Sequence, residues 1–325
     1  MLYSSDQLID LINLEIKALP FSKSPLALYQ PAEYAISLGG KRIRPVLTLM
    51  ACNLFADSIQ DAIAPALGIE IFHNFTLLHD DLMDKADLRR GNPTVHKKWS
   101  PNTAILTGDA MQIVAYQYIG KSPQHTLSSI LDLFSQTALE VCEGQQYDMD
   151  FENLDDVSVE QYLDMIRLKT AVLLACSLKV GAIIGGATEK DADLLYLFGE
   201  KIGLAFQLRD DLLDTFGDED TFGKTIGGDI VCNKKTFLLI KTLELASDLD
   251  KKTIANWLHQ VQFEKQEKVD AVTRIYIKNN IKELCETKIE SYFQEAMDAL
   301  YAVDVNVLHK SELIMLTEKL MHRQS

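Results

Sequence analysis

Two acidic segments of this chain share one spacing of aspartates, and that spacing is the strongest chemical signal in the sequence. The first segment is DDLMD at 80–84 and the second is DDLLD at 210–214, each following an apolar stretch. On an α-helix, residues i and i+4 lie on one face, so the first and last aspartates of each segment lie side by side. Like charges at this spacing repel each other and destabilise a helix. Two such segments therefore predict that a cation is held between the two helices.

The chemistry of the donors indicates which cation. Carboxylates with no His or Cys among them are oxygen-donor sites, which suit Mg²⁺. One segment alone would be typical of a solvated helix face, but two segments 130 residues apart, each followed by basic residues, favour a metal site. The candidate metal ligands are Asp80, Asp81, Asp84, Asp210, Asp211 and Asp214.

Basic segments supply the counterpart that such a metal needs, because Mg²⁺ is usually bound through a few carboxylates together with substrate phosphates. GGKRIRP at 39–45 places three cations on a glycine turn where a helix begins, and both the charges and the helix dipole favour an anion there. LRRG at 88–91 follows the first acidic segment, and arginine donates to phosphate in a bidentate manner. The alternatives are a basic surface loop for the first segment and an internal ion pair between Arg89 and a nearby aspartate for the second.

Weaker signals lie farther along the chain. Lys169-Thr170, Lys224-Thr225 and the NKKT run at 233–236 each place a lysine close to a threonine, which suits a phosphate but is common by chance. His73 lies seven residues before Asp80 and therefore on the same helical face. A lone histidine is more often a core residue with its hydrogen bonds satisfied than a ligand.

Composition limits the class of protein. The 325 residues are 47% hydrophobic with 8 prolines and contain no linker, so we expect a single domain over 1–325. The net charge of −15 argues against binding to nucleic acid or to anionic membranes. Five scattered cysteines indicate a reducing compartment, and the N-terminal segment lacks the features of a secretory signal. We expect a cytoplasmic protein without stable membrane insertion.

Hydrophobic periodicity predicts the elements that must position these residues. Stripes of period 3.6 recur from end to end while period-2 alternation is nearly absent, so the fold should be all-α, with long helices around a central space. The run 171–184 is apolar nearly all round, which predicts a buried helix. The expected helices are 5–18, 25–38, 45–56, 60–86, 101–119, 124–149, 158–185, 189–216, 234–247, 250–261, 265–300 and 309–322.

Taken together, these segments resemble the trans-isoprenyl diphosphate synthase family, also called polyprenyl synthetases. The motifs GGKRIRP, LLHDDLMDKADLRRG, RLKTA, FQLRDDLLDTFGD, FGKTIGGD and NKKTF stand in the order this family shows, over about residues 35–245. The resemblance implies an isoprenoid-synthase-like all-α bundle with a deep central cavity, a homodimer, and two acidic motifs that face each other across the cavity mouth. It also implies three Mg²⁺ ions that hold the diphosphate of an allylic substrate.

The resemblance assigns a role to each candidate residue. Asp80, Asp81, Asp84 and Asp210 should bind metal, while Asp211 and Asp214 follow less directly because the second motif uses fewer of its residues. Lys169, Arg89, Lys224 and Lys234 should contact the allylic diphosphate, and Thr170 and Gln207 should border the developing carbocation. The diphosphate of isopentenyl diphosphate should be held by Lys41, Arg44, His73 and Arg90.

The implied reaction condenses isopentenyl diphosphate with dimethylallyl, geranyl or farnesyl diphosphate by ionisation, condensation and elimination. Product length should depend on Phe75 and Phe72, which lie five and eight residues before Asp80. In the family, an aromatic residue at the first of these positions goes with short products. The two residues between the aspartates of the first motif, and Thr76 in place of a second aromatic, resemble enzymes that make C20 products more than those that make C15. Residues of the neighbouring helix are further candidates for the cavity lining: Met111, Val114, Ala115 and Tyr118.

Three other readings compete with a prenyl synthase. A class I terpene cyclase shares the first motif but usually carries a different second motif and needs no isopentenyl diphosphate site. A non-catalytic partner subunit typically lacks one acidic motif. A structural helical protein that binds Ca²⁺ on its surface would not account for the basic segments.

Overall fold

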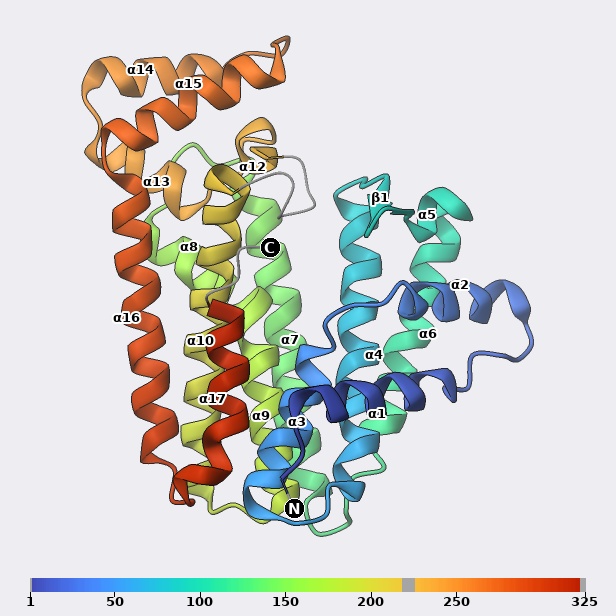
Figure 1. Cartoon of the computed structure of the whole chain (residues 1–325). Coiled ribbons are helices and arrows are strands. Elements are labelled where there is room, and N and C mark those ends of the chain that lie inside the picture. The colour runs from blue at the N-terminus through green and yellow to red at the C-terminus, as the bar shows by residue number, and fades with distance from the viewer. Residues whose placement is uncertain (1, 218–225, 322–325) are drawn as a thin grey trace. The chain divides into compact units, whose positions relative to one another are not determined.

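The computed structural model describes residues 2–217 and 226–321 and confirms the all-α prediction (Figure 1). It is 77% helical, and within the described residues the only strands are the two-residue pair β1 (Leu88–Arg89) and β2 (Asn92–Pro93). The helices are α1 (Ser5–Lys17), α2 (Leu26–Ser37), α3 (Ile43–Phe55), α4 (Gln60–Met83), α5 (Val95–Lys98), α6 (Pro101–Ile119), α7 (Leu127–Phe151), α8 (Val159–Ile166), the π-helix η1 (Arg167–Ala171), α9 (Val172–Gly185), α10 (Glu189–Phe216), α12 (Gly228–Val231), α13 (Phe237–Leu245), α14 (Asp248–His259), α15 (Lys265–Lys278), α16 (Ile281–Ala302) and α17 (Val307–Met321).

The chain forms two compact units, each assembled from three stretches of sequence. The first comprises residues 1–135, 176–196 and 303–313, and the second comprises 136–175, 197–302 and 314–325. Four of the five boundaries fall inside helices, in α7, α9, α10 and α17, and the fifth follows the end of α16. The single domain over 1–325 stays a prediction.

Close helix packing builds the first unit. A Cβ added at Gly181 of α9 would lie 2.0 Å from the carbonyl oxygen of Thr48 on α3, and one added at Gly68 of α4 would lie 3.0 Å from that of Ala115 on α6. Glycine at these crossings lets the backbones approach more closely than a side chain would allow. The first acidic segment therefore ends a helix, α4, that is held tightly by its neighbours.

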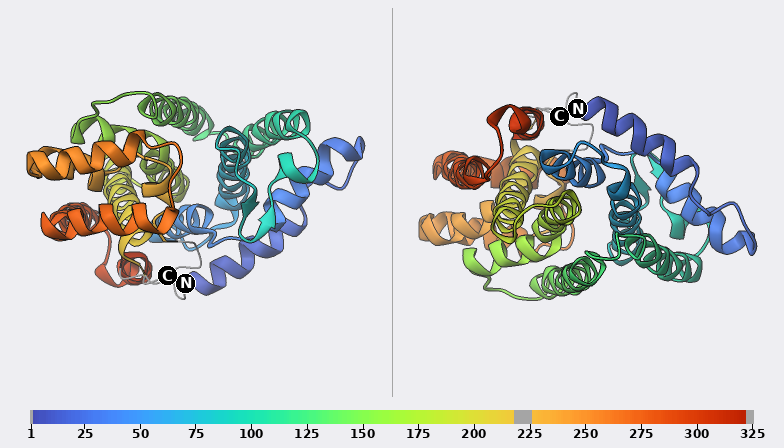
Figure 2. Two further views of the ribbon diagram at one scale, coloured as in Figure 1. Left: turned by 90° about the horizontal axis from the view of Figure 1, so that it is seen from above. Right: turned by 90° about the horizontal axis from the view of Figure 1, so that it is seen from below.

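In the second unit, α10 and α16 run side by side, and Figure 2 shows both end on. Lys201 of α10 forms an ion pair with Glu295 of α16 at 2.8 Å, and the Cys285 thiol lies 3.8 Å from the Leu208 carbonyl oxygen. Leu204, Leu208 and Leu212 of α10 are buried in the hydrophobic core of this unit. This packing fixes the helix that carries the second acidic segment.

The structure departs from the predicted elements at five places, two of which are the short helices α5 and α12, where no helix was predicted. The predicted helix 265–300 is two helices, separated at Asn279 and Asn280, and Asn280 adopts a positive φ of 54° that ends the regular helix. The predicted helix 158–185 contains a π-helical turn, and the β1–β2 hairpin lies where no strand was expected. These irregularities depend on contacts between elements, which hydrophobic periodicity does not report.

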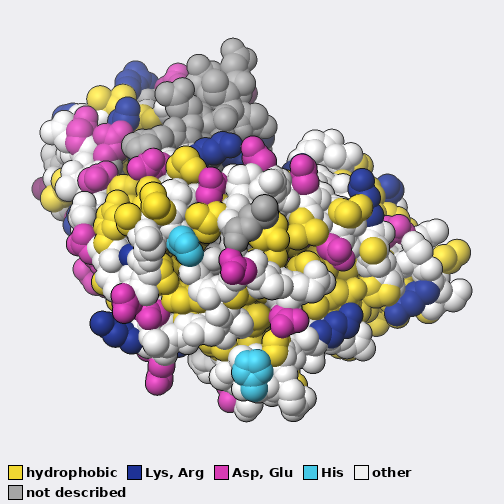
Figure 3. All heavy atoms as spheres, turned by 60° about the horizontal axis from the view of Figure 1, so that its bottom comes forward, with side chains coloured by type: hydrophobic (Ala, Val, Ile, Leu, Met, Phe, Trp, Pro, Cys, Tyr) yellow, Lys and Arg dark blue, Asp and Glu magenta, His cyan; other side chains and the backbone are white. Residues whose placement is uncertain are grey.

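The most apolar helical stretch, Val159–Gly185, has the length and apolar composition of a membrane span. Its most apolar part is 67% buried inside the protein, which is typical of a core helix. It includes the apolar run predicted to be buried, and eleven of the twelve residues from Ala171 to Ala182 are buried. Figure 3 shows acidic side chains spread over one face rather than gathered in a single patch.

The Gly181 contact gives a test of the first unit's packing. Gly181→Ala should lower the free energy of unfolding by about 1–3 kcal/mol, because the new methyl group meets the α3 backbone rather than a movable side chain. Thermal unfolding followed by circular dichroism measures the effect. Gly120→Ala is the matched control, since its Cβ would approach no atom closer than 3.3 Å. Equal stability of both variants would contradict the predicted close approach.

Candidate active site

The first acidic segment forms the last turn of α4 and its capping residue. The Asp84 amide donates to the Asp80 carbonyl oxygen at 2.8 Å, so the two residues lie one helical turn apart, as their spacing predicted. Asp84 is exposed and Asp80 is half-buried. The two carboxylates are hard oxygen donors on one helical face, which suits Mg²⁺.

Asp81 is instead buried and paired with an arginine. It is only 5% exposed, and Arg89 Nε lies 2.8 Å from both of its carboxylate oxygens, with Arg89 Nη2 2.7 Å from Oδ1. Burial raises the pKa of Asp81, and the contact with Arg89 opposes this rise. The structure thus forms the internal ion pair that the sequence left open. Metal binding by Asp81 and diphosphate binding by Arg89 stay predictions.

The hairpin between α4 and α5 positions this arginine and the next. Its two turn residues, Arg90 and Gly91, both have positive φ, of 52° and 73°, as a type I′ turn requires. Arg90 Nη1 donates to the carbonyl oxygen of Gly39. A Cβ on Gly40 would lie 2.8 Å from Arg90 Nη2, so the guanidinium rests directly on the glycine turn. Glycine at that position leaves room for the cation.

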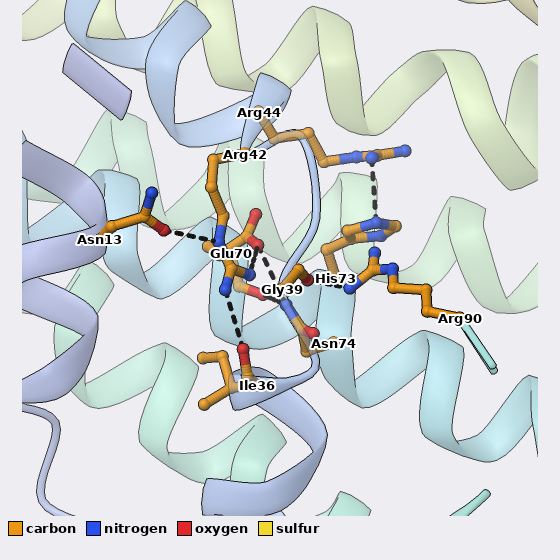
Figure 4. Close-up of polar contacts among 9 residues, drawn as sticks. All are labelled: Asn13, Ile36, Gly39, Arg42, Arg44, Glu70, His73, Asn74 and Arg90. Atoms are coloured by element: carbon orange, nitrogen blue, oxygen red, sulfur yellow. Dashed lines mark hydrogen bonds and ion pairs between the residues drawn. The ribbon is translucent and has the colours of Figure 1, made fainter. Parts of the chain in front are cut away.

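Within the basic segment at 39–45, Arg42 points inward and has a structural role (Figure 4). It is 5% exposed and adopts a left-handed conformation at the start of α3. Its guanidinium donates to Glu70 at 2.7 Å, to the Ile36 carbonyl oxygen at 2.8 Å and to Asn13 at 3.3 Å. Asn74 donates to the same Glu70 oxygen at 3.1 Å. This buried network anchors the basic loop to α4.

Arg44 turns the other way, toward His73. Arg44 Nη1 lies 3.1 Å from His73 Nε2. A guanidinium only donates, so Nε2 must accept, which places the ring proton on Nδ1. Burial lowers the pKa of His73 well below its ordinary value, and the charges of nearby arginines, Arg44 first, lower it further. His73 is therefore neutral at physiological pH. Burial lowers the pKa of Arg44 to about 10, which leaves it charged.

These side chains form a cationic cluster made of Arg44, His73 and Arg90, which Figure 4 shows close together. Among the described residues, neither Arg44 nor Arg90 forms a hydrogen bond or ion pair with a carboxylate, and the buried Arg44 Nε has no hydrogen-bond partner. Buried donors without acceptors are costly. The arrangement is typical of an anion-binding site. Lys41, on the same loop, is exposed.

The second acidic segment lies in the last two turns of α10, and Asp211 is its buried member. Asp211 is 5% exposed and accepts hydrogen bonds from the Tyr162 hydroxyl and, at 3.1 Å, from Gln207 Nε2. Burial raises the pKa of Asp211 well above its ordinary value, and the charge of Asp229 raises it further. Burial also raises the pKa of Tyr162, so the hydroxyl stays protonated and donates.

The other two aspartates of this segment are half-buried. Asp214 Oδ2 accepts from the Asp229 amide at 3.0 Å, which ties the end of α10 to the start of α12. Among the described residues, no group of three or more His, Cys, Asp or Glu side chains is close enough to enclose a metal ion. The donors nonetheless fit Mg²⁺, because this ion usually takes one or two carboxylates and completes its shell with water and substrate phosphates.

A π-helical turn, η1, carries the predicted catalytic pair Lys169 and Thr170. A Cβ on Gly144 of α7 would lie 2.3 Å from the Lys169 backbone nitrogen, and one on Gly203 of α10 would lie 2.5 Å from Ala171 Cα. The backbone of the turn therefore packs closely against α7 and α10 at these two glycines. Single π-turns inside α-helices occur frequently at functional sites, because they displace the backbone locally.

Two polar contacts orient the side chains on this turn. Lys169 Nζ forms an ion pair with Asp148 of α7 at 2.5 Å, and Thr170 Oγ1 lies 3.2 Å from Gln207 Oε1. The structure thus brings Thr170 and Gln207 into contact, while the neighbouring Lys169 pairs with α7.

The remaining predicted diphosphate contacts are less defined. Lys224 lies outside the described residues. Lys234 is exposed and follows Asn233, which adopts a left-handed conformation at φ 58°. The buried Lys268 of α15 holds that conformation by donating to Asn233 Oδ1 at 2.5 Å and to the Val231 carbonyl oxygen at 3.2 Å. The C-terminal region, which carried no interpretable motif, therefore supports the loop before Lys234.

The predicted length-determining residues lie in an aromatic cluster of the first unit. Phe75 is 7% exposed and Phe72 is fully buried, and their ring centroids are 5.3 Å apart. Phe72 also packs edge-on against Phe134 of α7 at 5.2 Å, and Phe75 against His79 at 4.9 Å. The two rings contact each other on α4, the helix that ends in the first acidic segment.

Sequence reasoning missed several residues that this architecture depends on. Glu70 could have been found, because a single acid within an apolar run on α4 requires a buried partner. Tyr162 and Lys268 carried no such signal, since their partners Asp211 and Asn233 lie 49 and 35 residues away in the sequence.

The Arg42–Glu70 pair gives a test of what anchors the basic loop. Glu70→Gln should lower the free energy of unfolding by about 3–5 kcal/mol, because it leaves the buried Arg42 guanidinium without a counter-charge. Urea and thermal unfolding measure the change. The double variant Arg42→Met with Glu70→Met should be more stable than Glu70→Gln, since no charge remains buried. A double variant as unstable as the single one would contradict the ion-pair explanation.

Comparison with known proteins identifies the family of this chain. The polyprenyl synthetase family matches residues 25–276. A geranylgeranyl diphosphate synthase from Sulfolobus acidocaldarius is 36% identical over 302 residues, covering 92% of this chain and 91% of that protein. A crystal structure of a geranylgeranyl pyrophosphate synthase aligns with a TM-score of 0.94 at 45% identity, over 99% of this chain and 100% of the other. A geranylgeranyl pyrophosphate synthetase from Pyrococcus horikoshii aligns with a TM-score of 0.90 at 33% identity, over 97% and 95%. The chain belongs to the polyprenyl synthetase family.

Proposed function

We propose that this protein is a short-chain trans-prenyltransferase. It condenses isopentenyl diphosphate with dimethylallyl, geranyl and farnesyl diphosphates and releases an all-trans prenyl diphosphate, with C20 favoured over C15. Membership in the polyprenyl synthetase family and the geranylgeranyl diphosphate synthases among its relatives support this proposal.

The observation that carries the proposal is the cationic cluster of Arg44, His73 and Arg90. Its two arginines lack carboxylate partners among the described residues, and the neutral His73 adds a hydrogen-bonding ring without adding charge. Such a cluster fits the diphosphate of isopentenyl diphosphate, a substrate that a terpene cyclase does not use. The exposed Lys41 supplies a further charge on the same loop.

Mg²⁺ supplies electrostatic neutralisation of the leaving diphosphate when it is bound. Three ions are proposed, as the family resemblance implies, with Asp80, Asp84 and Asp210 as the principal ligands. Asp81, Asp211 and Asp214 are further ligand candidates.

The chain's own groups support the ionisation of the allylic substrate. Lys169, on the π-turn, adds positive charge beside the leaving diphosphate, and Arg89 and Lys234 are proposed to contact the same group. The Thr170 hydroxyl and the Gln207 carbonyl present oxygen dipoles that stabilise a carbocation without attacking it. No protein base is assigned, because the released diphosphate can accept the proton that leaves. The protein is further proposed to be a cytoplasmic homodimer without stable membrane insertion.

A product assay tests the proposed function. Purified protein and Mg²⁺ are mixed with isopentenyl diphosphate and, separately, with each of the three allylic starters, and products are sized by mass spectrometry. We expect a C20 diphosphate from every starter and no product after EDTA is added. Asp80→Ala should abolish turnover without loss of helicity.

The other outcomes of this assay would change either the function or the product length. Cyclic hydrocarbons formed without consumption of isopentenyl diphosphate would identify a cyclase. No product from any starter would favour a non-catalytic partner subunit. A C15 diphosphate that is not extended would correct the product length alone.

The aromatic cluster makes a separate prediction about product length. Phe75→Ala should lengthen the product by one or more five-carbon units, because the prenyl tail descending from the first acidic segment meets Phe75 before Phe72. Mass spectrometry of the products reads this directly. Phe72→Ala is the matched control and should leave the length unchanged while Phe75 still blocks the path. An unchanged product from Phe75→Ala would place the floor elsewhere.

A further inference from the structure

A chain of hydrogen bonds in the second unit links three helical segments. The Tyr162 hydroxyl of α8 donates to Asp211 Oδ2, and Gln207 Nε2 donates to Asp211 Oδ1 at 3.1 Å, both acceptors being on α10. The Thr170 hydroxyl of η1 donates to Gln207 Oε1 at 3.2 Å. The chain begins at a buried tyrosine, 2% exposed, and ends at the two residues proposed to border the carbocation.

The direction of each bond follows from the chemistry of the groups. Both oxygens of Asp211 accept hydrogen bonds and the Thr170 hydroxyl donates, so the amide nitrogen of Gln207 faces Asp211 and its oxygen faces Thr170. The two ends of an amide have nearly the same shape, so packing alone does not select one orientation. Asp211 makes that selection, and the Tyr162 hydroxyl holds the other oxygen of Asp211 in place.

We propose that Tyr162 is a positioning residue for the condensation reaction, acting through Asp211 to keep the carbonyl end of the Gln207 amide directed toward Thr170. This inference rests on the proposed function. It deepens that function by assigning Asp211 to the orientation of the Gln207 amide in place of the metal ligation for which the family resemblance made it a less direct candidate. Both carboxylate oxygens of Asp211 already accept hydrogen bonds.

The orientation of the amide matters because its two ends carry opposite partial charges. The carbonyl oxygen stabilises a neighbouring cation, whereas the N–H end repels it. A flipped Gln207 would therefore disfavour the transition state for ionisation while leaving the diphosphate contacts intact. A loss of this kind appears in kcat and not in KM.

Tyr162→Phe tests the proposal with little change in packing. We expect kcat to fall by about 10- to 100-fold. The KM values for isopentenyl diphosphate and farnesyl diphosphate should stay unchanged, as should the Mg²⁺ concentration that gives half-maximal rate. Tyr276→Phe is the matched control: Tyr276 is equally buried, at 2% exposure, but lies outside the hydrogen-bond chain, so its kcat should match wild type.

Asp211→Asn provides a second variant of nearly identical shape. Its amide would donate to Gln207 and so favour the flipped orientation. We expect a loss of kcat at least as large as that of Tyr162→Phe, again at unchanged Mg²⁺ dependence. The double variant should be no slower than Asp211→Asn alone, because both changes act through one chain of contacts.

Three results would overturn the proposal: a wild-type kcat for Tyr162→Phe, the same loss in Tyr276→Phe, or an increased Mg²⁺ requirement in Asp211→Asn, which would make Asp211 a metal ligand. Circular dichroism and thermal unfolding of each variant separate these results from misfolding. Failure of the wild-type protein to form any prenyl diphosphate would instead refute the proposed function.

Discussion

A carboxylate that leaves water must be given hydrogen-bond donors, and this requirement shapes both acidic segments in the same way. The second aspartate of each segment, Asp81 and Asp211, is 5% exposed and is supplied with donors. Arg89 serves the first, and Tyr162 with Gln207 serves the second. Because residue i+1 points about 100° away from residue i on a helix, burying this aspartate leaves the first and fifth positions on another face.

Two irregular elements carry other polar groups of these networks. Arg89 is delivered by a two-stranded hairpin whose turn has two residues with positive φ. Thr170, which orients Gln207 from the other side, sits on a π-turn held between Gly144 and Gly203. In each case a regular helix would point the side chain elsewhere, so the local distortion is what brings the polar groups together.

Two arginines of the basic loop differ in their partners and therefore in their roles. Arg42 and Arg44 are two positions apart, yet Arg42 enters a closed network with Glu70 while Arg44 meets the neutral His73. The first arrangement satisfies its charge within the protein, and the second leaves the charge available to an anion. The buried Arg42–Glu70 ion pair thus fixes the loop, and Arg44 with His73 provides groups that can bind an anion.

A residue of the C-terminal third of the chain, Lys268, also has a structural role. Lys268 buries its ammonium against backbone and amide oxygens and thereby holds the left-handed Asn233 that precedes Lys234. Burial lowers the pKa of Lys268. No carboxylate takes part in the two hydrogen bonds that it makes, so its role is to fix a loop conformation rather than to balance charge.

The sequence by itself determined the all-α class, most helix positions and the candidate residues, because hydrophobic periodicity and the i, i+4 spacing of charges are local properties. It also determined which aspartates share a helical face. Only the tertiary structure decided which of these charges are buried and with whom they pair. Asp81 with Arg89 was one of two open alternatives, whereas Asp211 with Tyr162 and Lys268 with Asn233 had no local signal. Partners distant in sequence meet only when helices pack, and the energy of a charged group depends on that packing more than on its neighbours along the chain.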